Sequence, residues 1–275
     1  MTTPEEKADL LRARTPGQVM ALGMGAVALS FLFAGIVFEF ASDAPVHVVS
    51  IVANALGMIA VPVAYVAWQR LHVAASLRLL PVPTPQLLWV LGMIVAIVPA
   101  VLALGQWNQR LVPPPPEYLE RVAQAMPETL PQWILAVFAM VVVAPIAEEI
   151  VFRGMVQQAA RRAIGRWFSV VFTAVVFAVW HGQLWNVAAL TLVGLFLGLA
   201  FEATGSLLAS IAAHSTYNFV VMLIYTHGTD VPDLPPTAAA FGAACALAVA
   251  WAAYGRLRVV VPWPEIDREG EAAED

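Results

Sequence analysis

The sequence predicts an all-α polytopic membrane protein, a bundle of about eight transmembrane helices. Three observations support this prediction. First, 60% of the 275 residues are hydrophobic, 12% are charged and the mean hydropathy is +0.77, whereas soluble domains are about 45–50% apolar and about 25% charged. Second, the chain contains eight apolar runs, and a helix needs roughly 20 such residues to cross about 30 Å of hydrocarbon. Third, the basic residues are concentrated in alternate loops.

The eight runs are joined by short polar or proline-containing loops, which leaves no room for a separate soluble domain. The first run is longer than the roughly 7–15 apolar residues of a signal peptide, so we expect an uncleaved anchor. Before it, Thr3–Glu6 has the pattern of a capping box and predicts a short helix. The fourth run is expected to continue as a cytoplasmic helix over Arg153–Arg162. The expected spans are Gln18–Phe40, Val48–Trp68, Leu87–Gly105, Trp133–Val151, Trp167–His181, Val187–Phe201, Ser206–Tyr225 and Thr237–Tyr254.

The distribution of basic residues orients these spans. With the N-terminus inside, the outer loops keep only Arg110 and Arg121 of the 14 basic residues. Cytoplasmic loops are the ones enriched in Lys and Arg, so both termini are expected in the cytoplasm. The preference for Arg over Lys and the Ala-rich spans favour a bacterial inner membrane. The inner basic residues are Lys7, Arg12, Arg14, Arg70, Arg78, Arg153, Arg161, Arg162, Arg166, Arg256, Arg258 and Arg268.

Three segments follow from this organisation. Residues 1–17 form a cytoplasmic N-terminal segment, residues 18–256 the transmembrane bundle, and residues 257–275 an acidic cytoplasmic tail. The net charge of −5 argues against a nucleic-acid partner, and the lipid bilayer is the expected surrounding. The single cysteine, Cys245, excludes an intrachain disulfide and is expected to be a small buried apolar residue.

Six polar residues lie inside or at the ends of the apolar runs, where ionisable groups are costly. Such residues usually face a cavity and mark a functional site. They are Glu148, Glu149, Arg153, His181, His214 and Asn218.

The two adjacent glutamates are expected to have different roles. Glu149 and Arg153 are four residues apart, so they share a helix face and can form an ion pair. Glu148 points about 100° away on the same turn, which leaves it free for general acid–base chemistry. The alternative interpretation is a helix end at the membrane interface, with both carboxylates in water.

The histidines also permit two interpretations. His181 ends its run beside a tryptophan, where it could be interfacial or catalytic. His214 and Asn218 are four apart on one helix face, where they could act in chemistry or in hydrogen bonds between helices. The helical rise places Glu148 and His214 at similar depths and His181 nearer the outer face.

Together these residues form three motifs in order, Glu148-Glu149-x-x-x-Arg153, Phe177-x-x-x-His181 and His214-x-x-x-Asn218. This arrangement resembles the CAAX-protease and bacteriocin-processing family (CPBP, or Abi) of intramembrane endopeptidases. The resemblance covers roughly residues 137–219, within a protease-like core at about 133–225.

The resemblance implies a glutamate-type protease acting on a peptide or protein substrate in or at the membrane. Glu148 would activate water, with His181 assisting, and His214 and Asn218 would stabilise the oxyanion. Glu149 and Arg153 would form a structural pair behind this site.

Other functions fit parts of the pattern. The chain could be a non-catalytic immunity or scaffold protein of the same family, or a small transporter with a proton relay. Glu148, His181 and His214 could also hold zinc, as in some metalloproteases. A site without metal or cofactor is favoured, because a zinc site would need Glu149 as base and would leave Arg153 unpaired.

Overall fold

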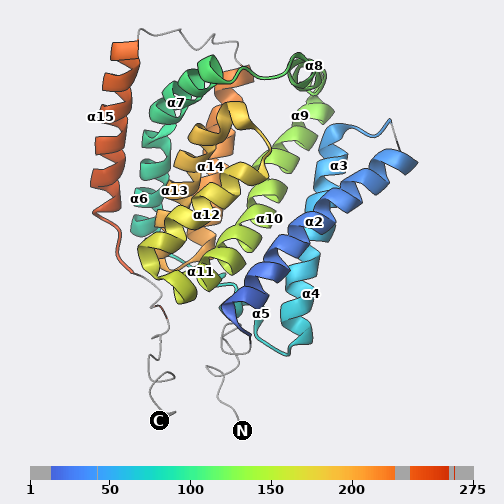
Figure 1. Ribbon diagram of the computed structural model, residues 1–275, viewed down its shortest axis with the longest axis vertical. Coiled ribbons are helices and arrows are strands. Elements are labelled where there is room, and N and C mark those ends of the chain that lie inside the picture. The colour runs from blue at the N-terminus through green and yellow to red at the C-terminus, as the bar shows by residue number, and fades with distance from the viewer. Residues whose placement is uncertain (1–13, 42, 227–235, 260–262, 264–275) are drawn as a thin grey trace.

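The computed structural model describes residues 14–41, 43–226, 236–259 and 263, and every regular element in this part of the chain is a helix. Figure 1 shows that the long helices run up and down in one bundle, and that the start of α2 and the end of α15 lie at the same lower end. The all-α membrane fold is therefore confirmed. The predicted helix at Thr3–Glu6 and most of the acidic tail lie outside the described residues.

Within the described part of the chain, seven helical segments are long and apolar enough to cross a membrane. The segments of 18 residues or more are Pro16–Phe40 (α2), Val46–Trp68 (α3, η1 and α4), Thr84–Leu111 (α6 and α7), Leu130–Ile164 (α9, η2, α10, η3 and α11), Leu184–Thr204 (η4 and α13), Leu207–Thr226 (α14) and Thr237–Tyr254 (within α15, Pro236–Tyr254). The eighth expected span is the shorter helix α12 (Arg166–Trp180), of 15 residues. At about 1.5 Å per residue it extends roughly 22 Å, less than the hydrocarbon thickness.

Local sequence explains where the helices begin and end. Thr15 caps α2 in a reciprocal capping box with Gln18, and Pro16 occupies the first helical position. Gly165, with a φ of 83°, separates α11 from α12, and Gly205, with a φ of 70°, ends α13. Residues with a side chain rarely adopt these left-handed values, so glycine permits both sharp reversals.

Three stretches of wide π-type turns interrupt the α-helices. They are η1 (Asn54–Ala60), η2 (Phe138–Val143) and η3 (Phe152–Gln157). Pro62 and Pro145 each follow a wide stretch by two residues. Proline lacks the N–H group and clashes with the carbonyl four residues earlier, and the wide turn accommodates this defect. The segments η2 and η3 flank α10 (Ala144–Val151), which carries the glutamate pair.

The fourth span corrects one expectation. The continuation over Arg153–Arg162 does exist, as η3 and α11 (Gln158–Ile164), but its first part is not a cytoplasmic projection. All residues of η3 are buried in the bundle, and Arg153 and Gln157 are 0% exposed. They are buried because α13 (Val187–Thr204) passes beside them and its carbonyls accept their hydrogen bonds.

Small residues bring α12 and α13 close together at the centre of the bundle. A methyl group at Gly194 would lie 3.0 Å from the Cα of Ala174, and one at Gly198 would lie 3.0 Å from Gln157 Oε1. Both distances are shorter than most real Cβ contacts, so a side chain at either position would require its neighbours to shift. The close approach leaves the Gly194 and Gly198 carbonyls within reach of Arg153 and Gln157.

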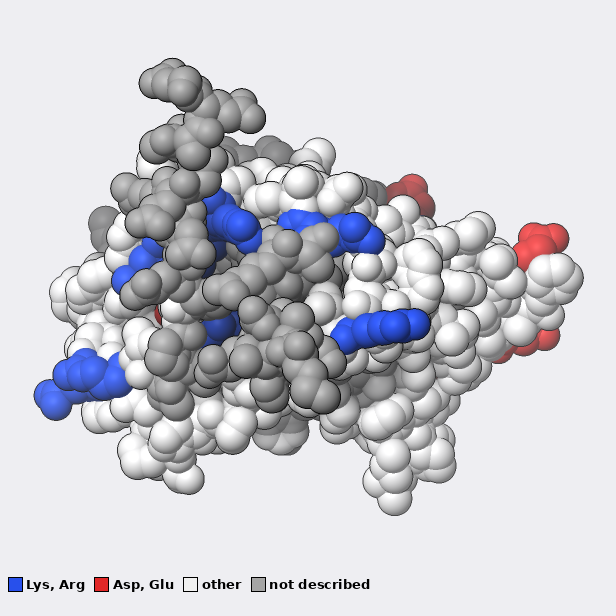
Figure 2. Space-filling model, turned by 90° about the horizontal axis from the view of Figure 1, so that it is seen from below, with Lys and Arg blue, Asp and Glu red and all other residues white. Residues whose placement is uncertain are grey.

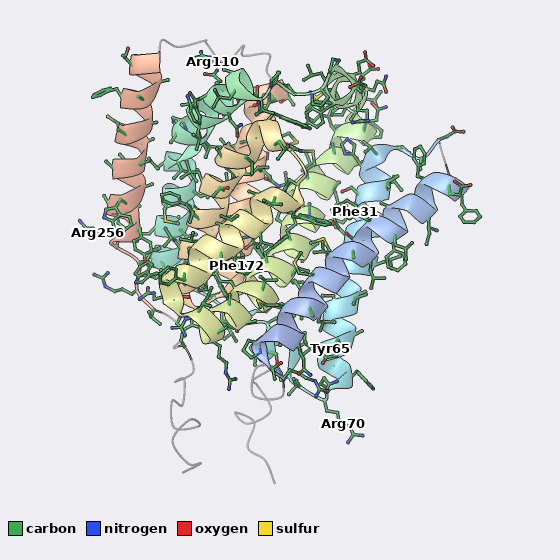
Figure 3. The ribbon with its side chains drawn as sticks, viewed as in Figure 1. Phe31, Tyr65, Arg70, Arg110, Phe172 and Arg256 are labelled. Carbon is green, nitrogen blue, oxygen red and sulfur yellow. The ribbon has the colours of Figure 1, made fainter. Side chains whose placement is uncertain are left out.

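Basic residues gather at the lower end of the molecule. Figure 2 shows this face from below, with arginine side chains spread over it and acidic side chains confined mainly to its edge. In Figure 3, Arg70 lies at the lower end and Arg256 lies beside the lower end of α15, whereas Arg110 lies at the upper end. The same end holds Trp263, whose ring lies between the guanidinium groups of Arg78 and Arg161, 4.1 and 4.4 Å from its centroid.

Helix α15 lies at the edge of the bundle and corrects the expectation for Cys245, which is exposed. The helix packs against α6 (Thr84–Ala96) and α7 (Val98–Leu111) through one alanine-rich face, with Ala246 and Ala250 buried. Cys245 faces away from that contact, so an apolar sequence here indicated a lipid-facing helix and not a buried one.

Candidate active site

Glu149 lies at the centre of the bundle and is 0% exposed. Its Oε1 accepts hydrogen bonds from Arg153 Nη1 at 2.8 Å and from His214 Nδ1 at 2.9 Å, and its Oε2 accepts from Ser210 Oγ at 2.5 Å. A buried carboxylate is stable only when it is paired and hydrogen-bonded, and these contacts meet that need. The interpretation that both glutamates are in water at a helix end is therefore wrong for Glu149.

Arg153 neutralises Glu149 from one helical turn away, as the spacing predicted. Its second terminal nitrogen donates to the carbonyl of Gly194 at 3.0 Å, and its guanidinium lies 4.8 Å from the centre of the Phe177 ring. The arginine therefore joins α10 to α12 and α13, the helices that surround the site. Its complete burial makes it a structural element of the site.

Glu148 faces the two histidines. Its Oε2 lies 3.9 Å from Nε2 of His181 and 3.8 Å from Nε2 of His214. This oxygen is buried and has no hydrogen-bond partner among the described residues. The side chains of Glu148 and His181 are 16% and 22% exposed, which leaves one side of the cluster accessible. The fold therefore places one carboxylate oxygen of Glu148 within 3.9 Å of a ring nitrogen of each histidine, although the three residues are distant in sequence.

The other ring nitrogens define which tautomer each histidine adopts. His181 Nδ1 lies 2.7 Å from the carbonyl oxygen of Phe177, which can only accept, so Nδ1 carries the hydrogen. His214 Nδ1 likewise donates to the ionised Glu149. In the neutral form of each ring, Nε2 is then an acceptor facing Glu148.

Asn218 lies one turn beyond His214 on α14. Its Nδ2 donates to the carbonyl of Met140 in η2 at 2.8 Å. This contact is the hydrogen bond between helices that the second interpretation of the HxxxN motif expected. An amide has two N–H groups, so this contact leaves the second for other partners.

The structure adds two polar residues that the sequence analysis missed. Ser210 lies four residues before His214 and shares its helix face, so the stripe of Ser210, His214 and Asn218 was a signal in the sequence. Asn108, on α7, is buried; it donates to the Leu184 carbonyl and accepts from the backbone N–H of Ala188. Asn108 thereby fixes the loop that follows His181. Nothing in the sequence around Asn108 indicated this role.

The depth estimates were correct for Glu148 and His214, which approach to 3.8 Å. The expectation that His181 lies nearer the outer face was wrong, because His181 is equally close to Glu148. Helix α12 has the expected length of 15 residues, so its position in the bundle and not its length accounts for the difference.

A metal site was considered as an alternative. Among the described residues, no group of three or more His, Cys, Asp or Glu side chains is placed to hold a metal ion. Zinc ligands lie about 2.0–2.2 Å from the ion, which places two ligand atoms of a tetrahedral site roughly 3.3–3.6 Å apart. The separations of 3.8 and 3.9 Å around Glu148 Oε2 exceed that spacing.

Comparisons with known proteins point to one family. Residues 130–220 match the family model of type II CAAX prenyl endopeptidase Rce1-like proteins. A curated relative, an uncharacterized 24.3 kDa protein of Escherichia coli, is 28% identical over 149 residues, which cover 52% of this chain and 64% of that protein. The aligned region is thus less than two thirds of that relative's length, and no solved structure matches the chain. The matched segment contains the glutamate pair and both histidines, so residues 130–220 support the resemblance to the CAAX-protease and bacteriocin-processing family.

Proposed function

We propose that the chain is an intramembrane endopeptidase in which Glu148 activates the attacking water. The observation that supports this proposal most directly is the environment of Glu148 Oε2. The oxygen is buried, lacks a hydrogen-bond partner among the described residues and faces two imidazole nitrogens at 3.8 and 3.9 Å. Polar atoms at bilayer depth without a partner are costly, and a functional site is the usual reason for keeping them.

The distances from Glu148 Oε2 to the Nε2 atoms of His181 and His214 suit a water molecule that bridges them. Two hydrogen bonds of about 2.8 Å to one water oxygen, at a bent angle, span roughly 4 Å. A water between Glu148 and His181 would donate one hydrogen to the carboxylate and the other to the imidazole Nε2. Its lone pair would then be free to attack a peptide carbonyl.

The reaction follows from these positions. The water oxygen forms a bond to the carbonyl carbon while Glu148 takes one water proton, which gives a tetrahedral intermediate with a negative oxygen. When this intermediate collapses, the C–N bond breaks and Glu148 delivers the proton to the leaving nitrogen. His181 orients the water through Nε2, because Phe177 fixes its tautomer through Nδ1.

Charge balance supports the role of His214 as an oxyanion donor. Glu148 and Glu149 carry two negative charges, and Arg153 supplies one positive charge within the cluster. With a hydrogen on both ring nitrogens, His214 binds Glu149 through Nδ1–H and directs Nε2–H into the site. A donor aimed at a developing oxyanion is worth roughly 10²–10³ in kcat. Asn218 is the proposed second donor, through the N–H that Met140 does not use.

The position of the site defines the proposed substrate and setting. The reactive groups lie among membrane-spanning helices, so the substrate is a peptide or protein segment that reaches into or lies at the bilayer. The basic lower end favours a cytoplasmic location for that face, with the protein in a bacterial inner membrane.

Comparison of cells expressing the wild type or Glu148→Gln tests the proposal without knowledge of the substrate. Mass spectrometry of protein N-termini in the membrane fraction should find new termini with the wild type that Glu148→Gln lacks. A substrate found in this way is then reconstituted with each protein in proteoliposomes, where cleavage should fall by about 10²–10⁴-fold. Glu120→Gln, on the separate helix α8 (Pro116–Gln124), is the matched control and should keep full activity.

Two outcomes would decide against the proposal. Identical sets of termini in the wild type and in Glu148→Gln would favour the non-catalytic role of a membrane immunity or scaffold protein. Equal cleavage by both purified proteins would remove Glu148 from the chemistry.

A further inference from the structure

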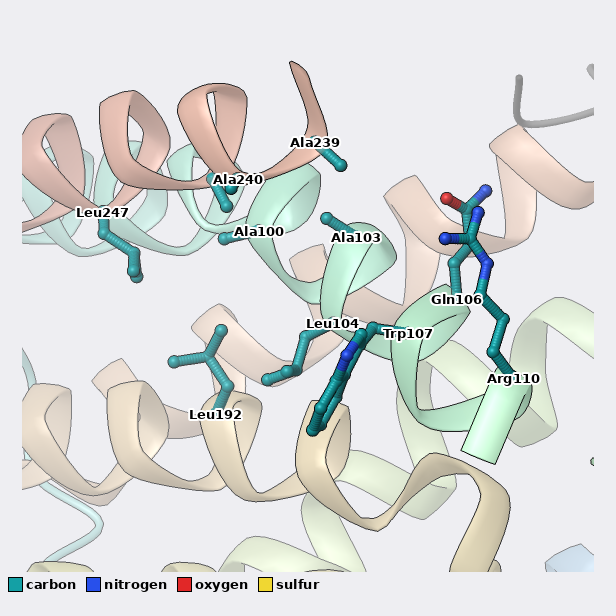
Figure 4. A pocket seen from close by; sticks show the side chains of 11 residues that line it. Ala100, Ala103, Leu104, Gln106, Trp107, Arg110, Leu192, Ala239, Ala240 and Leu247 are labelled. Atoms are coloured by element: carbon teal, nitrogen blue, oxygen red, sulfur yellow. The ribbon is translucent and has the colours of Figure 1, made fainter. Parts of the chain in front are cut away.

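A cavity lies away from the glutamate and histidine cluster, between α7, α13 and α15. Its volume is about 280 Å³. Figure 4 shows it from close by, with Leu247 at one end and Gln106 and Arg110 at the other. The helices around it all belong to membrane-spanning segments, so the cavity lies within the thickness of the bilayer.

Small side chains create the space. Helix α15 packs against α6 and α7 and barely touches α13, so a crevice remains between α13 and α15 with α7 as its floor. The apolar part of the wall combines alanines with a few larger residues, namely Ala100, Ala103, Leu104, Leu192, Ala239, Ala240, Ala243 and Leu247. This wall offers an occupant dispersion contacts and no hydrogen bonds.

The polar end of the cavity has the character of a membrane interface. Gln106, Trp107 and Arg110 come from the last turns of α7, at the upper end of the bundle. Tryptophan is enriched at the level of the lipid headgroups, and the flexible arginine stem carries its charge toward them. The guanidinium has five N–H groups, so it can serve a phosphate in addition to its contacts within the protein.

Physical chemistry restricts what can fill this space. Apolar cavities of this kind stay dry, because water needs two to four polar partners. An empty void forfeits the dispersion contacts of all the atoms that line it. The cavity is smaller than the roughly 300–1,000 Å³ of most ligand pockets, so a thin, flexible chain suits it better than a bulky ligand. In a bilayer, the abundant thin apolar molecule is the hydrocarbon tail of a lipid.

We propose that this cavity holds one acyl chain of a membrane phospholipid, with the headgroup phosphate beside Arg110. The chain lies along the alanines of α7 and α15 and reaches toward Leu247. It fills the contact between α13 and α15 that the protein leaves open. Because Leu192 precedes Gly194 by two residues, the bound chain also supports the part of α13 that accepts the Arg153 hydrogen bond.

Photo-crosslinking in lipid nanodiscs tests this site. The full chain is reconstituted with phosphatidylethanolamine and phosphatidylglycerol, including a small fraction of phosphatidylglycerol with a diazirine near the end of one acyl chain. After irradiation, mass spectrometry should find labelling concentrated at Ala100–Leu104 and Ala239–Leu247, relative to exposed lipid-facing residues such as Val249 and Trp251. Even labelling of all lipid-facing helices would overturn the proposal.

Two variants one residue apart provide the matched comparison. Ala243→Phe places a ring in the cavity and should reduce this labelling several-fold, whereas Ala244→Phe, exposed and outside the lining, should not change it. Ala103→Phe fills the same space from α7 and should reproduce the loss if Ala243→Phe fails to fold. Equal labelling of either filled variant and of Ala244→Phe would overturn the proposal.

The headgroup contact has its own test. Arg110→Gln should reduce labelling by the diazirine phospholipid but not by a diazirine fatty alcohol, which has the chain without the phosphate. An equal effect on both probes would contradict the placement of a phosphate at Arg110. The thermal midpoint gives a second measurement, because added phospholipid should raise it in the wild type and not in Ala243→Phe.

Discussion

The two adjacent glutamates have opposite surroundings. Glu149 is fully buried and accepts hydrogen bonds from Arg153, His214 and Ser210. Glu148 has an oxygen without such a partner among the described residues, and its side chain is 16% exposed. The first arrangement stabilises the fold, and the second leaves a carboxylate available for chemistry.

We therefore expect Glu149→Gln and Glu148→Gln to separate stability from activity. The Glu149 variant leaves Arg153 buried without a counter-charge, which should cost about 3–5 kcal/mol of folding free energy. Glu148→Gln should leave the yield and thermal midpoint unchanged. Size-exclusion profiles and thermal melts in the same detergent measure both effects. If Glu148→Gln lost as much folded protein as Glu149→Gln, the division of roles would be wrong.

Metal independence is a prediction about the same residues. Purified wild type should keep its cleavage activity after dialysis against a strong chelator, because the proposed water is activated by Glu148 alone. Elemental analysis should find less than stoichiometric zinc. Loss of activity on chelation, with recovery on addition of zinc, would favour the metalloprotease alternative.

The sequence predicted contacts between residues that are close in sequence better than contacts between distant residues. The four-residue spacing of Glu149 and Arg153 determines their ion pair, because a helix places such residues on one face. The bond between His214 and Glu149 spans 65 residues, and it depends on how α10 and α14 pack. Residue spacing contains no information about that packing, so the second partner of Glu149 could not be predicted.

Among the elements, the contact between α12 and α13 determines where the site residues lie. Helix α12 ends at His181, and the Gly194 carbonyl on α13 accepts from Arg153. Gly194 favours their close approach, since a methyl group there would lie 3.0 Å from the Ala174 Cα and the neighbouring backbone would have to shift.

Gly194→Ala should therefore force the two helices apart. Overpacking of this kind typically costs about 1–3 kcal/mol. We expect a lower thermal midpoint, together with a fall in kcat that exceeds the change in KM, because His181 and Arg153 both shift. Gly92→Ala on α6 is the control: a methyl group there meets nothing within 4 Å, so helix propensity should leave stability equal or about 1 kcal/mol higher. Equal melting behaviour of both variants would contradict the packing argument.

Hydrophobic runs predicted the existence and order of the helices, because a helix in lipid must be apolar along its length. They did not predict that η3, the start of the continuation of the fourth span, is buried in the bundle, or that α12 ends beside Glu148. Both features depend on neighbours: α12 ends inside the bundle at its histidine, and η3 is covered by α13. Buried protein contacts and lipid contacts select the same apolar residues, so hydropathy does not distinguish them.

For the whole molecule, the distribution of charge leads to a topology prediction. The lower end contains most of the described arginines, so we expect it to face the cytoplasm. Reporter fusions after Asp43 and Glu128, in two upper loops, should give a periplasmic signal, and a fusion after Gly165 should give a cytoplasmic signal. A cytoplasmic signal after Asp43 or Glu128 would refute the orientation, whatever the activity of the protein.

The wide turns on either side of α10 affect the whole bundle. In terms of helical phase, a wide turn is an α-helix with one inserted residue, and each residue contributes about 100° of rotation. Deleting Val141 from η2 would return the turn to α geometry. Glu148 would then be rotated by about 100° about the helix axis relative to the part of the helix before Phe138. The carboxylate would then no longer face His181, even though no reactive residue had been changed. The additional residue in η2, a segment that has no reactive side chain, therefore keeps the Glu148 carboxylate oriented toward His181.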